Sequence, residues 1–131
     1  MENRFKIAAS ERTPAVDLDF LARSLSLSGE SYPEDAASFF GPLFEAIKLL
    51  LADPRGGPVR VEIALAYFNS SSAKALMNIL QAMEAAAGSG TPVEVVWRHA
   101  ADDEMMREFG EDFGEDLVHV RFVLESVEGA A

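Results

Sequence analysis

Apolar residues occupy every second position in two short runs near the start of the chain: Val16, Leu18 and Phe20 alternate with aspartates, and Leu25 and Leu27 alternate with serines. A period of two is typical of strands that bury one face. The pattern predicts strands over residues 5–8, 16–20 and 24–28. The short connection between the second and third strands favours a hairpin.

After the hairpin, the spacing of the apolar positions becomes helical. It predicts three amphipathic helices, over residues 36–51, from Ser70 or Ser71 to the position before Gly88, and over residues 102–116. The residues expected to face inward are Ala36, Phe39, Phe40, Leu43, Phe44, Ile47, Leu50 and Leu51 in the first helix, Ala73, Leu76, Met77, Leu80, Met83 and Ala87 in the second, and Met105, Met106, Phe109 and Phe113 in the third.

Further strands are predicted at residues 59–68, 92–98 and 118–124. In the strand at 59–68, one face is predicted to carry Val59, Val61, Ile63, Leu65 and Tyr67, and the other Ala64, Ala66 and Phe68. Both faces become apolar near the end of the strand, which predicts a central strand covered on both sides. Alternating strands and helices favour right-handed crossovers and parallel pairing. We therefore predict a single α/β domain over residues 1–131, with a mixed, mostly parallel sheet and helices packed on it. We expect ragged ends at about 1–4 and 126–131.

Charge narrows the possible partners. The chain has 22 acidic and 11 basic residues, a formal net charge of -11, and no cysteine. This balance argues against nucleic acid and against an anionic membrane surface. The absence of cysteine excludes disulfides and thiolate chemistry. The sequence begins without the pattern of an export signal, and its apolar stretches are too short to span a bilayer. We therefore expect a cytoplasmic protein with no membrane insertion.

The run Asn69-Ser70-Ser71-Ser72 lies where a buried strand is predicted to meet a helix. Asn and Ser are preferred N-cap residues, so the local sequence favours a simple helix cap. The position also suits an anion, because free backbone N–H groups and the positive end of the helix dipole meet there. A phosphate on one of these serines would be stabilised. The two roles are compatible.

A second polar segment, residues 29–35, precedes the first helix. Pro33 suits a first helical turn, and the acids after it suit the positive end of the helix dipole. Pro42 either kinks this helix or marks its true start. The segment is either an ordinary loop and helix start or a partner surface built from Tyr32 and Glu34.

The other ionisable residues form no recognisable catalytic or metal site. His99 and His119 lack the spacing of zinc ligands, and both are expected at the surface or at an edge. A triad of Ser70, His99 and Asp102 would lack the strand–turn–helix nucleophile motif. The acidic third helix is better explained as a solvated face than as a docking strip for a basic partner. We expect no metal, no cofactor and no enzymatic activity.

Three segments, Gly29–Glu34, Tyr67–Met77 and Val95–Arg98, resemble signature stretches of the SiaC family, small bacterial regulatory phosphoproteins. The similarity extends from about Thr13 to the last strand. The family is itself similar to anti-anti-sigma factors with a STAS-type fold, whose phosphoserine lies between a central strand and the next helix. SiaC-type proteins tend to carry Asn-Thr-Ser-Ser there, and Ser70 stands at the threonine position. The resemblance implies that Ser70 is the phosphoacceptor.

The resemblance also implies partner switching that tunes cyclic di-GMP and biofilm formation. A protein kinase of histidine-kinase-like ATPase fold adds the phosphate, and a metal-dependent Ser/Thr phosphatase removes it. The unmodified form binds and activates a diguanylate cyclase. Lys74 lies one helical turn after Ser70, where it is placed to pair with a phosphate across solvent. The expected partner-binding residues are Tyr32, Pro33, Glu34, Asn69, Ser71, Ser72 and Lys74.

Two other functions stay open on the sequence. The first is a STAS-like module that holds a small anionic ligand or nucleotide at the same helix N-terminus. The second is a plain scaffold domain. A thermal-shift screen separates the first from partner switching, because a ligand that binds the folded form raises the melting temperature.

Overall fold

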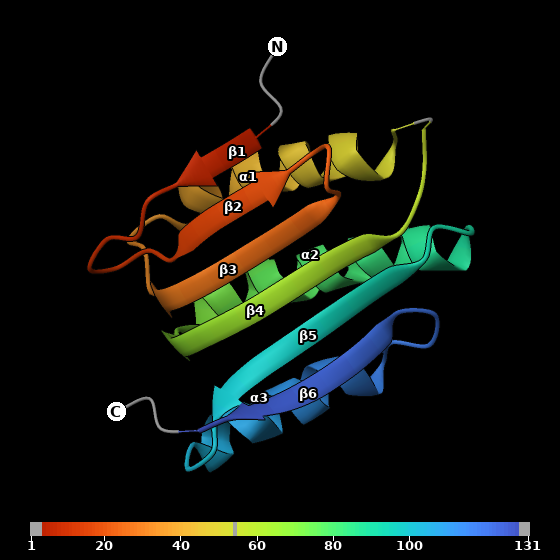
Figure 1. The fold of residues 1–131 in the computed structure, drawn as a ribbon. Coiled ribbons are helices and arrows are strands. Elements are labelled where there is room, and N and C mark those ends of the chain that lie inside the picture. The colour runs from red at the N-terminus through yellow and green to blue at the C-terminus, as the bar shows by residue number, and fades with distance from the viewer. Residues whose placement is uncertain (1–3, 54, 129–131) are drawn as a thin grey trace.

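Six strands and three helices make up the part of the chain that the computed structural model describes, residues 4–53 and 55–128. In chain order they are β1 (Arg4–Ile7), β2 (Ala15–Asp19), β3 (Ser24–Ser31), α1 (Ala36–Leu51), β4 (Val59–Phe68), α2 (Ser70–Gly88), β5 (Val93–Ala100), α3 (Glu104–Glu115) and β6 (Arg121–Val127). The strands form one sheet in the order β1-β2-β3-β4-β5-β6 (Figure 1).

The sheet is mixed, as the sequence predicts. β1 and β3 both pair antiparallel with β2, whereas β3, β4, β5 and β6 run parallel to one another. A short turn can join only antiparallel neighbours, and each parallel pair needs a longer crossover, which here is a helix. The predicted α/β class and the N-terminal hairpin are confirmed.

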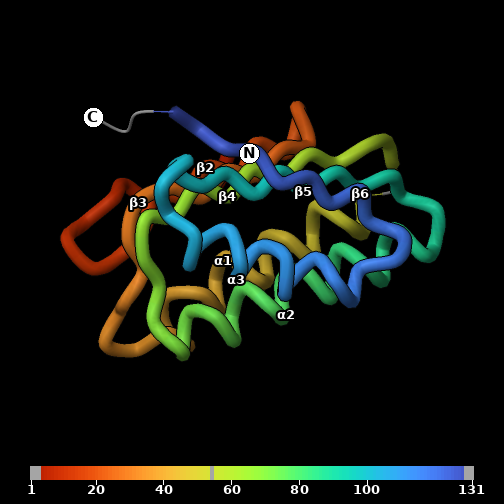
Figure 2. The backbone as a smooth tube through the Cα atoms, turned by 90° about the horizontal axis from the view of Figure 1, so that it is seen from below, coloured from red at the N-terminus to blue at the C-terminus, as the bar shows by residue number. Residues whose placement is uncertain are grey.

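All three helices lie on the same face of the sheet, as Figure 2 shows from below. The strand order never reverses, so crossovers of one hand always return on the same side. The prediction that the strand at 59–68 is covered on both sides is therefore wrong. On its open side, Arg60 is exposed and Glu62 and Ala64 are half-buried.

The open face of the sheet carries alternating charges that link three strands. Arg60 Nη1 lies 2.6 Å from Glu94 Oε1, and Arg98 Nε lies 2.8 Å from Glu125 Oε1. Arg98 also pairs with Glu62, and this hydrogen bond is the main reason that the pKa of Glu62 is lowered. These charges keep one face of the sheet compatible with solvent.

A bulge near the end of β4 changes which side chains face the core. The register with β3 shifts after Leu65 and leaves Ala66 as the extra residue. A bulge of this kind interrupts the alternation of side chains along a strand. As a result Phe68 is buried, whereas Tyr67 is 50% exposed. The sequence pattern, which places Tyr67 on the same face as Val59, is wrong at this end of the strand.

Most residues expected to face inward from the helices are buried or pack against the core. Met77, Met105 and Phe109 differ, with exposures of 39%, 67% and 37%. In α2 the buried stripe passes through Ile79 instead of Met77. His99 is also buried, which corrects its expected surface position. It alternates along β5 with solvent-side residues and so shares the core side with Trp97.

Every helix begins at an Asx N-cap: Asp35 for α1, Asn69 for α2 and Asp103 for α3. The Asp35 carboxylate accepts a hydrogen bond from the Ser38 backbone N–H at 3.1 Å. Pro33 therefore precedes the helix, and its predicted place in the first turn is wrong. Pro42 lies inside α1 and does not mark its start.

The observed element ends differ slightly from the expected ones. α3 occupies residues 104–115, and the last strand begins at Arg121, because Val118 lies in the connection before it and is exposed. Arg4 opens β1, and residues 126–127 close β6, so regular structure extends into the ends that the sequence places as ragged. The outermost positions of those ends lie outside the described residues.

Candidate functional site

The start of α2 lies at the carboxyl ends of the parallel strands. Asn69 has extended backbone angles, φ -90° and ψ 177°, and its side chain accepts a hydrogen bond from the Ser72 backbone N–H at 2.9 Å. Its carbonyl accepts the first helical hydrogen bond, from the Ala73 N–H at 2.9 Å. The cap that the local sequence favours is therefore present. It fixes the direction in which the following serines point.

Ser72 is fully buried and ties α2 to the end of β3. Its Oγ lies 2.8 Å from the Oγ of Ser31 and donates to the Ser31 carbonyl at 3.0 Å. The Asn69 N–H donates to the same carbonyl at 3.1 Å. Both hydroxyls are thus satisfied inside the protein. Ser72, expected among the partner-binding residues, is therefore buried beneath the start of α2.

Ser70 and Ser71 are exposed and face different sides of α2. Successive helical residues are about 100° apart, so neighbouring side chains diverge. Ser71 points toward α1 and lines a groove between the two helices. Ser70 lies on the flank that it shares with Met77 and Glu84, and Glu84 contacts the connection between α3 and β6. The two serines are therefore distinguishable by their surroundings.

The end of β3 lies directly beside the start of α2. Tyr32 follows β3 and packs its ring edge-on against Tyr67 of β4, with ring centroids 5.8 Å apart. Glu34 is exposed and pairs with Arg12, whose Nη1 lies 2.7 Å from Glu34 Oε1. Pro33, which lies between Tyr32 and Glu34 in the chain, is buried. The fold thus brings together the two segments that carry the family resemblance.

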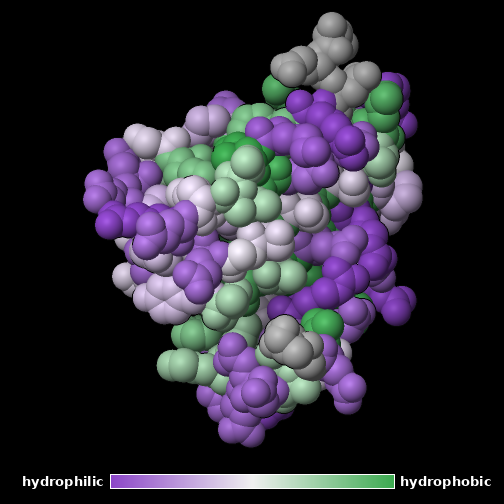
Figure 3. Space-filling model, turned by 60° about the vertical axis from the view of Figure 1, so that its left-hand side comes forward, coloured by the Kyte–Doolittle hydropathy of each residue, from purple (hydrophilic) through white to green (hydrophobic). Residues whose placement is uncertain are grey.

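Figure 3 shows this end of the molecule, since the carboxyl ends of β3 to β6 lie on the left in Figure 1 and come forward in the turned view. A band of apolar and weakly polar surface runs between hydrophilic patches.

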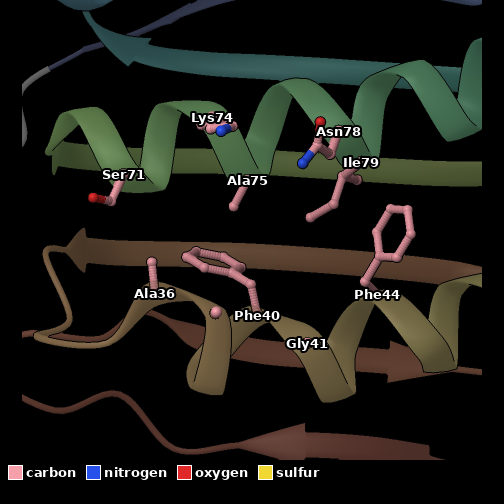
Figure 4. A pocket seen from close by; sticks show the side chains of 10 residues that line it. Ala36, Phe40, Gly41, Phe44, Ser71, Lys74, Ala75, Asn78 and Ile79 are labelled. Atoms are coloured by element: carbon pink, nitrogen blue, oxygen red, sulfur yellow. The ribbon is translucent and has the colours of Figure 1, made fainter.

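The groove between α1 and α2 begins next to Ser71. Its volume is about 420 Å³, and apolar side chains form most of its lining. Figure 4 shows Ala75 and Ile79 of α2 projecting toward Phe40 of α1, with Lys74 at the rim. The residues that line it are Ala36, Ala37, Phe40, Gly41, Phe44, Ser71, Lys74, Ala75, Asn78 and Ile79.

The site has the electrostatics of a helix start, with few fixed charges of its own. Lys74 is exposed and forms no salt bridge with any other described residue. At the neighbouring start of α1, hydrogen bonds from the Ser38 side chain and backbone lower the pKa of Asp35, against a small opposing effect of burial. The Asp35 cap is therefore an ionised carboxylate at neutral pH.

The sheet has no switch-point crevice of the kind that binds ligands in open α/β folds. In open α/β sheets, ligands bind in the crevice where the strand order reverses, and this order has no reversal. Among the described residues, no three His, Asp or Glu side chains gather as metal ligands. No helix within the same residues combines the length and apolarity required to cross a membrane.

The positions or contacts of three residues of this site could not be predicted from the local sequence. The alternation places Tyr67 on the face of Val59, because the bulge at Ala66 has no signature in the apolar pattern. Ser31 lies inside the resemblance segment Gly29–Glu34, but its contact with Ser72 has no local signal, and neither has that of Arg12 with Glu34, since these contacts join residues 41 and 22 positions apart. The paired resemblance segments were the available hint that the end of β3 belongs to the site.

The fold places the chain among single α/β domains whose mixed sheet is covered by helices on one face. A family model for SiaC family regulatory phosphoproteins matches residues 7–127. An uncharacterised protein of Pseudomonas aeruginosa strain UCBPP-PA14 is 37% identical over 110 residues, which are 84% of this chain and 86% of the relative. The chain belongs to the SiaC family of regulatory phosphoproteins.

Two solved structures are similar over nearly their whole length. The crystal structure of the diguanylate cyclase SiaD in complex with its activator SiaC from Pseudomonas aeruginosa contains a chain that matches with a TM-score of 0.89 and 34% identity. The match covers 94% of this chain and 99% of that one. Apo-SiaC from the same organism matches with a TM-score of 0.86 and 34% identity, over 95% of this chain and 99% of the other.

Proposed function

We propose that the protein is a non-enzymatic, cytoplasmic partner-switching regulator. In its unmodified form it binds and activates a diguanylate cyclase, and phosphorylation of Ser70 prevents this binding. A kinase of histidine-kinase-like ATPase fold adds the phosphate, and a metal-dependent Ser/Thr phosphatase removes it. Through the cyclase, the switch tunes cyclic di-GMP and biofilm formation.

The observation that carries this proposal is the position of Ser70. It is the first residue of α2, its side chain is exposed, and it follows a complete N-cap. A kinase can reach such a hydroxyl without unfolding the helix. Ser72, by contrast, is fully buried in its hydrogen bonds with Ser31, and its modification would require the end of β3 to separate from α2.

The relatives support the identity of the partner. SiaC of Pseudomonas aeruginosa is an activator seen in complex with the cyclase SiaD, and this chain matches that structure over 94% of its length. We propose that the surface around the start of α2 makes the corresponding contact. Tyr32, Glu34, Ser71 and Lys74 supply side chains to it, and Asn69 fixes the helix start. Buried Pro33 and Ser72 shape it from below.

Phosphate chemistry accounts for the switch. A phosphoserine adds about -1.5 to -2 charges at neutral pH, together with a shell of bound water. Inside an interface, those charges must be desolvated or paired. A penalty of about 3 kcal/mol is roughly a hundredfold in affinity. In the free protein, the helix N-terminus stabilises the same phosphate, so modification favours the unbound form.

The test is phosphorylation by a purified kinase of this class with ATP, followed by intact mass and site mapping. Ser70→Ala and Ser71→Ala are matched variants, because both residues are exposed in the first turn of α2. We expect one phosphate, mapped to Ser70, lost in Ser70→Ala and retained in Ser71→Ala. Label on Ser71 would overturn the assignment. No label on the wild-type protein would overturn the proposed switch.

A further inference from the structure

We propose that the free edge of β6 binds an extended, basic segment of another protein, which adds a further strand to the six-stranded sheet. The segment alternates Lys or Arg side chains, which lie against α3, with small apolar side chains on the open side of the sheet. This binding site is independent of the proposed switch, because β6 and α3 contain none of the residues to which the switch is assigned.

β6 ends the sheet, and among the described residues only β5 pairs with it (Figure 1). The Val127 carbonyl accepts a hydrogen bond from the Ala101 N–H, directly after β5, at 3.1 Å. Backbone groups alternate sides along a strand, so the N–H and C=O groups of Phe122, Leu124 and Ser126 point away from β5. No backbone group of a described loop or helix bonds to them. Such a row of donors and acceptors is a template for an added strand.

The opposite edge strand, β1, is less suited to this kind of pairing. It has four residues and carries Arg4 and Lys6. Short edge strands and charged residues, lysine especially, are common protections against pairing with another chain. β6 has seven residues and contains no lysine or proline. Its charged residues, Arg121 and Glu125, pair with side chains of β5 at 3.2 Å and 2.8 Å. β6 therefore presents the longer edge, without the usual protection.

A hollow of about 590 Å³ lies along this edge, bounded by α3, the connection that follows it and β6. Phe122 and Leu124 of β6 and Leu117 of the connection give it an apolar lining. Leu124 is 37% exposed. A strand added beside β6 would place every second side chain on this side of the sheet. A cavity of about 150 Å³ holds one benzene-sized group, so the hollow has room for the side chains of that face.

The charge of the hollow favours basic side chains. Glu111, Asp112 and Glu115 of α3 line it, and no basic residue of the described chain does. Residues 102–116 hold eight of the 22 acidic residues and one of the 11 basic ones. That one, Arg107, lies with its Nη1 3.1 Å from Glu111 Oε2. The alkyl stem of a lysine or arginine would pack on the apolar lining while its charged end meets the carboxylates.

The other side of β6 favours small apolar side chains. Val123 is half-buried there, between Arg121 and Glu125, whose charges already pair with β5. A valine in the added strand would pack beside Val123 as its cross-strand neighbour. A segment that fits both sides of the edge therefore alternates basic and small apolar residues.

The acidic helix disfavours a second copy of this chain as the occupant. Two β6 strands paired antiparallel about a twofold axis would place their α3 helices side by side on one face of a continuous sheet. Glu111 and Glu115 line the side of α3 next to the edge, so the same carboxylates of both copies would approach one another. Like charges in an interface oppose association.

The experiment is an NMR titration of the isotope-labelled protein with a blocked peptide of the length of β6, seven residues, in which lysine alternates with valine. A matched peptide carries N-methyl groups on all backbone nitrogens, which removes its donors and keeps its charge. We expect saturable shifts at the amides of Phe122, Leu124 and Ser126, and binding at least about tenfold weaker for the methylated peptide. Equal binding of the two peptides, or shifts confined to other elements, would overturn strand addition.

The role of charge is tested at about 0.15 M salt, where remote charges are screened. Glu115→Lys and Glu108→Lys change the net charge of α3 equally, both residues are exposed, and only Glu115 lines the hollow. We expect Glu115→Lys to weaken binding of the lysine peptide about fivefold or more, and Glu108→Lys to stay within about twofold of wild type. Equal weakening by both variants would reduce the binding to a general attraction and overturn the hollow as the site.

A peptide that alternates glutamate with valine tests the same point on the unaltered protein. We expect it not to bind, and binding equal to that of the lysine peptide would overturn the basic character of the segment. Sedimentation velocity of the protein alone and with the lysine peptide covers the second copy. A dimer that the peptide dissociates would make the edge of β6 a self-association surface and overturn the inference, whereas a monomer in both samples supports it.

Discussion

Ser70 and Ser72 are two positions apart, but their hydroxyls have opposite environments. Ser70 is exposed at the first position of α2, whereas Ser72 is fully buried against Ser31. A buried hydroxyl that loses its partner leaves the other without a hydrogen bond, which costs about 1–3 kcal/mol. The serine run therefore contains two exposed hydroxyls, those of Ser70 and Ser71, and one buried hydroxyl that holds the fold together.

Ser72→Ala is predicted to lower the free energy of unfolding by about 1–3 kcal/mol, because it leaves the Ser31 hydroxyl unpaired. Ser70→Ala is predicted to change it by less than about 0.5 kcal/mol, as expected for an exposed position. Urea denaturation of both variants measures the difference. Equal stability of the two variants would contradict the buried role of Ser72, and Ser31→Ala/Ser72→Ala should recover part of the loss.

For single residues, the sequence predicts contacts between near neighbours in the chain but not contacts between residues far apart in it. The Asn69 cap depends on residues three positions apart, so the pattern predicts it. The Ser31–Ser72 pair joins residues 41 positions apart, so no local sequence pattern predicts it. Tyr67 was misplaced because one extra residue in β4 reverses the alternation.

At the scale of elements, α3 packs on the sheet through two glycines. A Cβ at Gly110 would lie 2.6 Å from atoms of Trp97 and Leu124, and a Cβ at Gly114 would lie 2.6 Å from Phe122. These contacts leave no room for a side chain. The helix can therefore approach β5 and β6 closely, and Trp97 Nε1 donates a hydrogen bond to the Met106 carbonyl at 3.0 Å.

The same substitution is predicted to have opposite effects in two helices. Gly41→Ala in α1 should stabilise the protein by up to about 1 kcal/mol, since alanine is the better helix former and the site is open. Gly110→Ala should destabilise it, because overpacking costs about 1–3 kcal/mol and exceeds that gain. Chemical denaturation provides both values. A stabilised Gly110→Ala variant would contradict the packing of α3.

Glu84 of α2 holds the connection between α3 and β6. Its carboxylate accepts hydrogen bonds from the backbone N–H groups of Val118, His119 and Val120 at 2.9–3.1 Å, and the His119 Nδ1 lies 2.7 Å away. Burial raises the pKa of Glu84, but these hydrogen bonds together outweigh it and lower the pKa to about 2. The carboxylate is thus a clamp between elements distant in sequence.

Glu84→Gln is predicted to lower the melting temperature at pH 7, with a loss that depends on pH. The native pKa of about 2 lies below the ordinary value of 4.5, so the carboxylate contributes fully above about pH 4.5. Its contribution is lost as the pH falls from there toward 2. The difference between wild type and variant should shrink over this window. A difference that stays constant down to pH 2 would contradict the clamp.

Element existence and order were predictable, because apolar periods of two and 3.6 are strong signals over long segments. The ends of the helices and strands, and the faces that they expose, were less predictable. The helical spacing places Met77 and Met105 at the edge of the inward-facing stripe, and in the structure both side chains are exposed. The apolar pattern also started the last strand at Val118, where the backbone is held instead by Glu84.

For the whole molecule, the sequential strand order decides where binding can occur. It places all helices on one face and all parallel strand ends at one edge. The open face is occupied by paired charges, and the edge carries the two exposed serines and the helix groove. The sequence predicts the sheet and its mixed character, but not its one-sided cover, because the face on which a right-handed crossover lies depends on the strand order, which the apolar pattern does not reveal.

Ser70 is the proposed switch for cyclase binding. The decisive measurement is the affinity of purified SiaD for the unmodified protein and for protein carrying phosphate at Ser70, with mapped stoichiometry and equal ionic strength. We predict tight binding by the unmodified form and an affinity lower by about a hundredfold for the phosphorylated form. Equal affinities, or tighter binding by the phosphorylated form, would contradict the account.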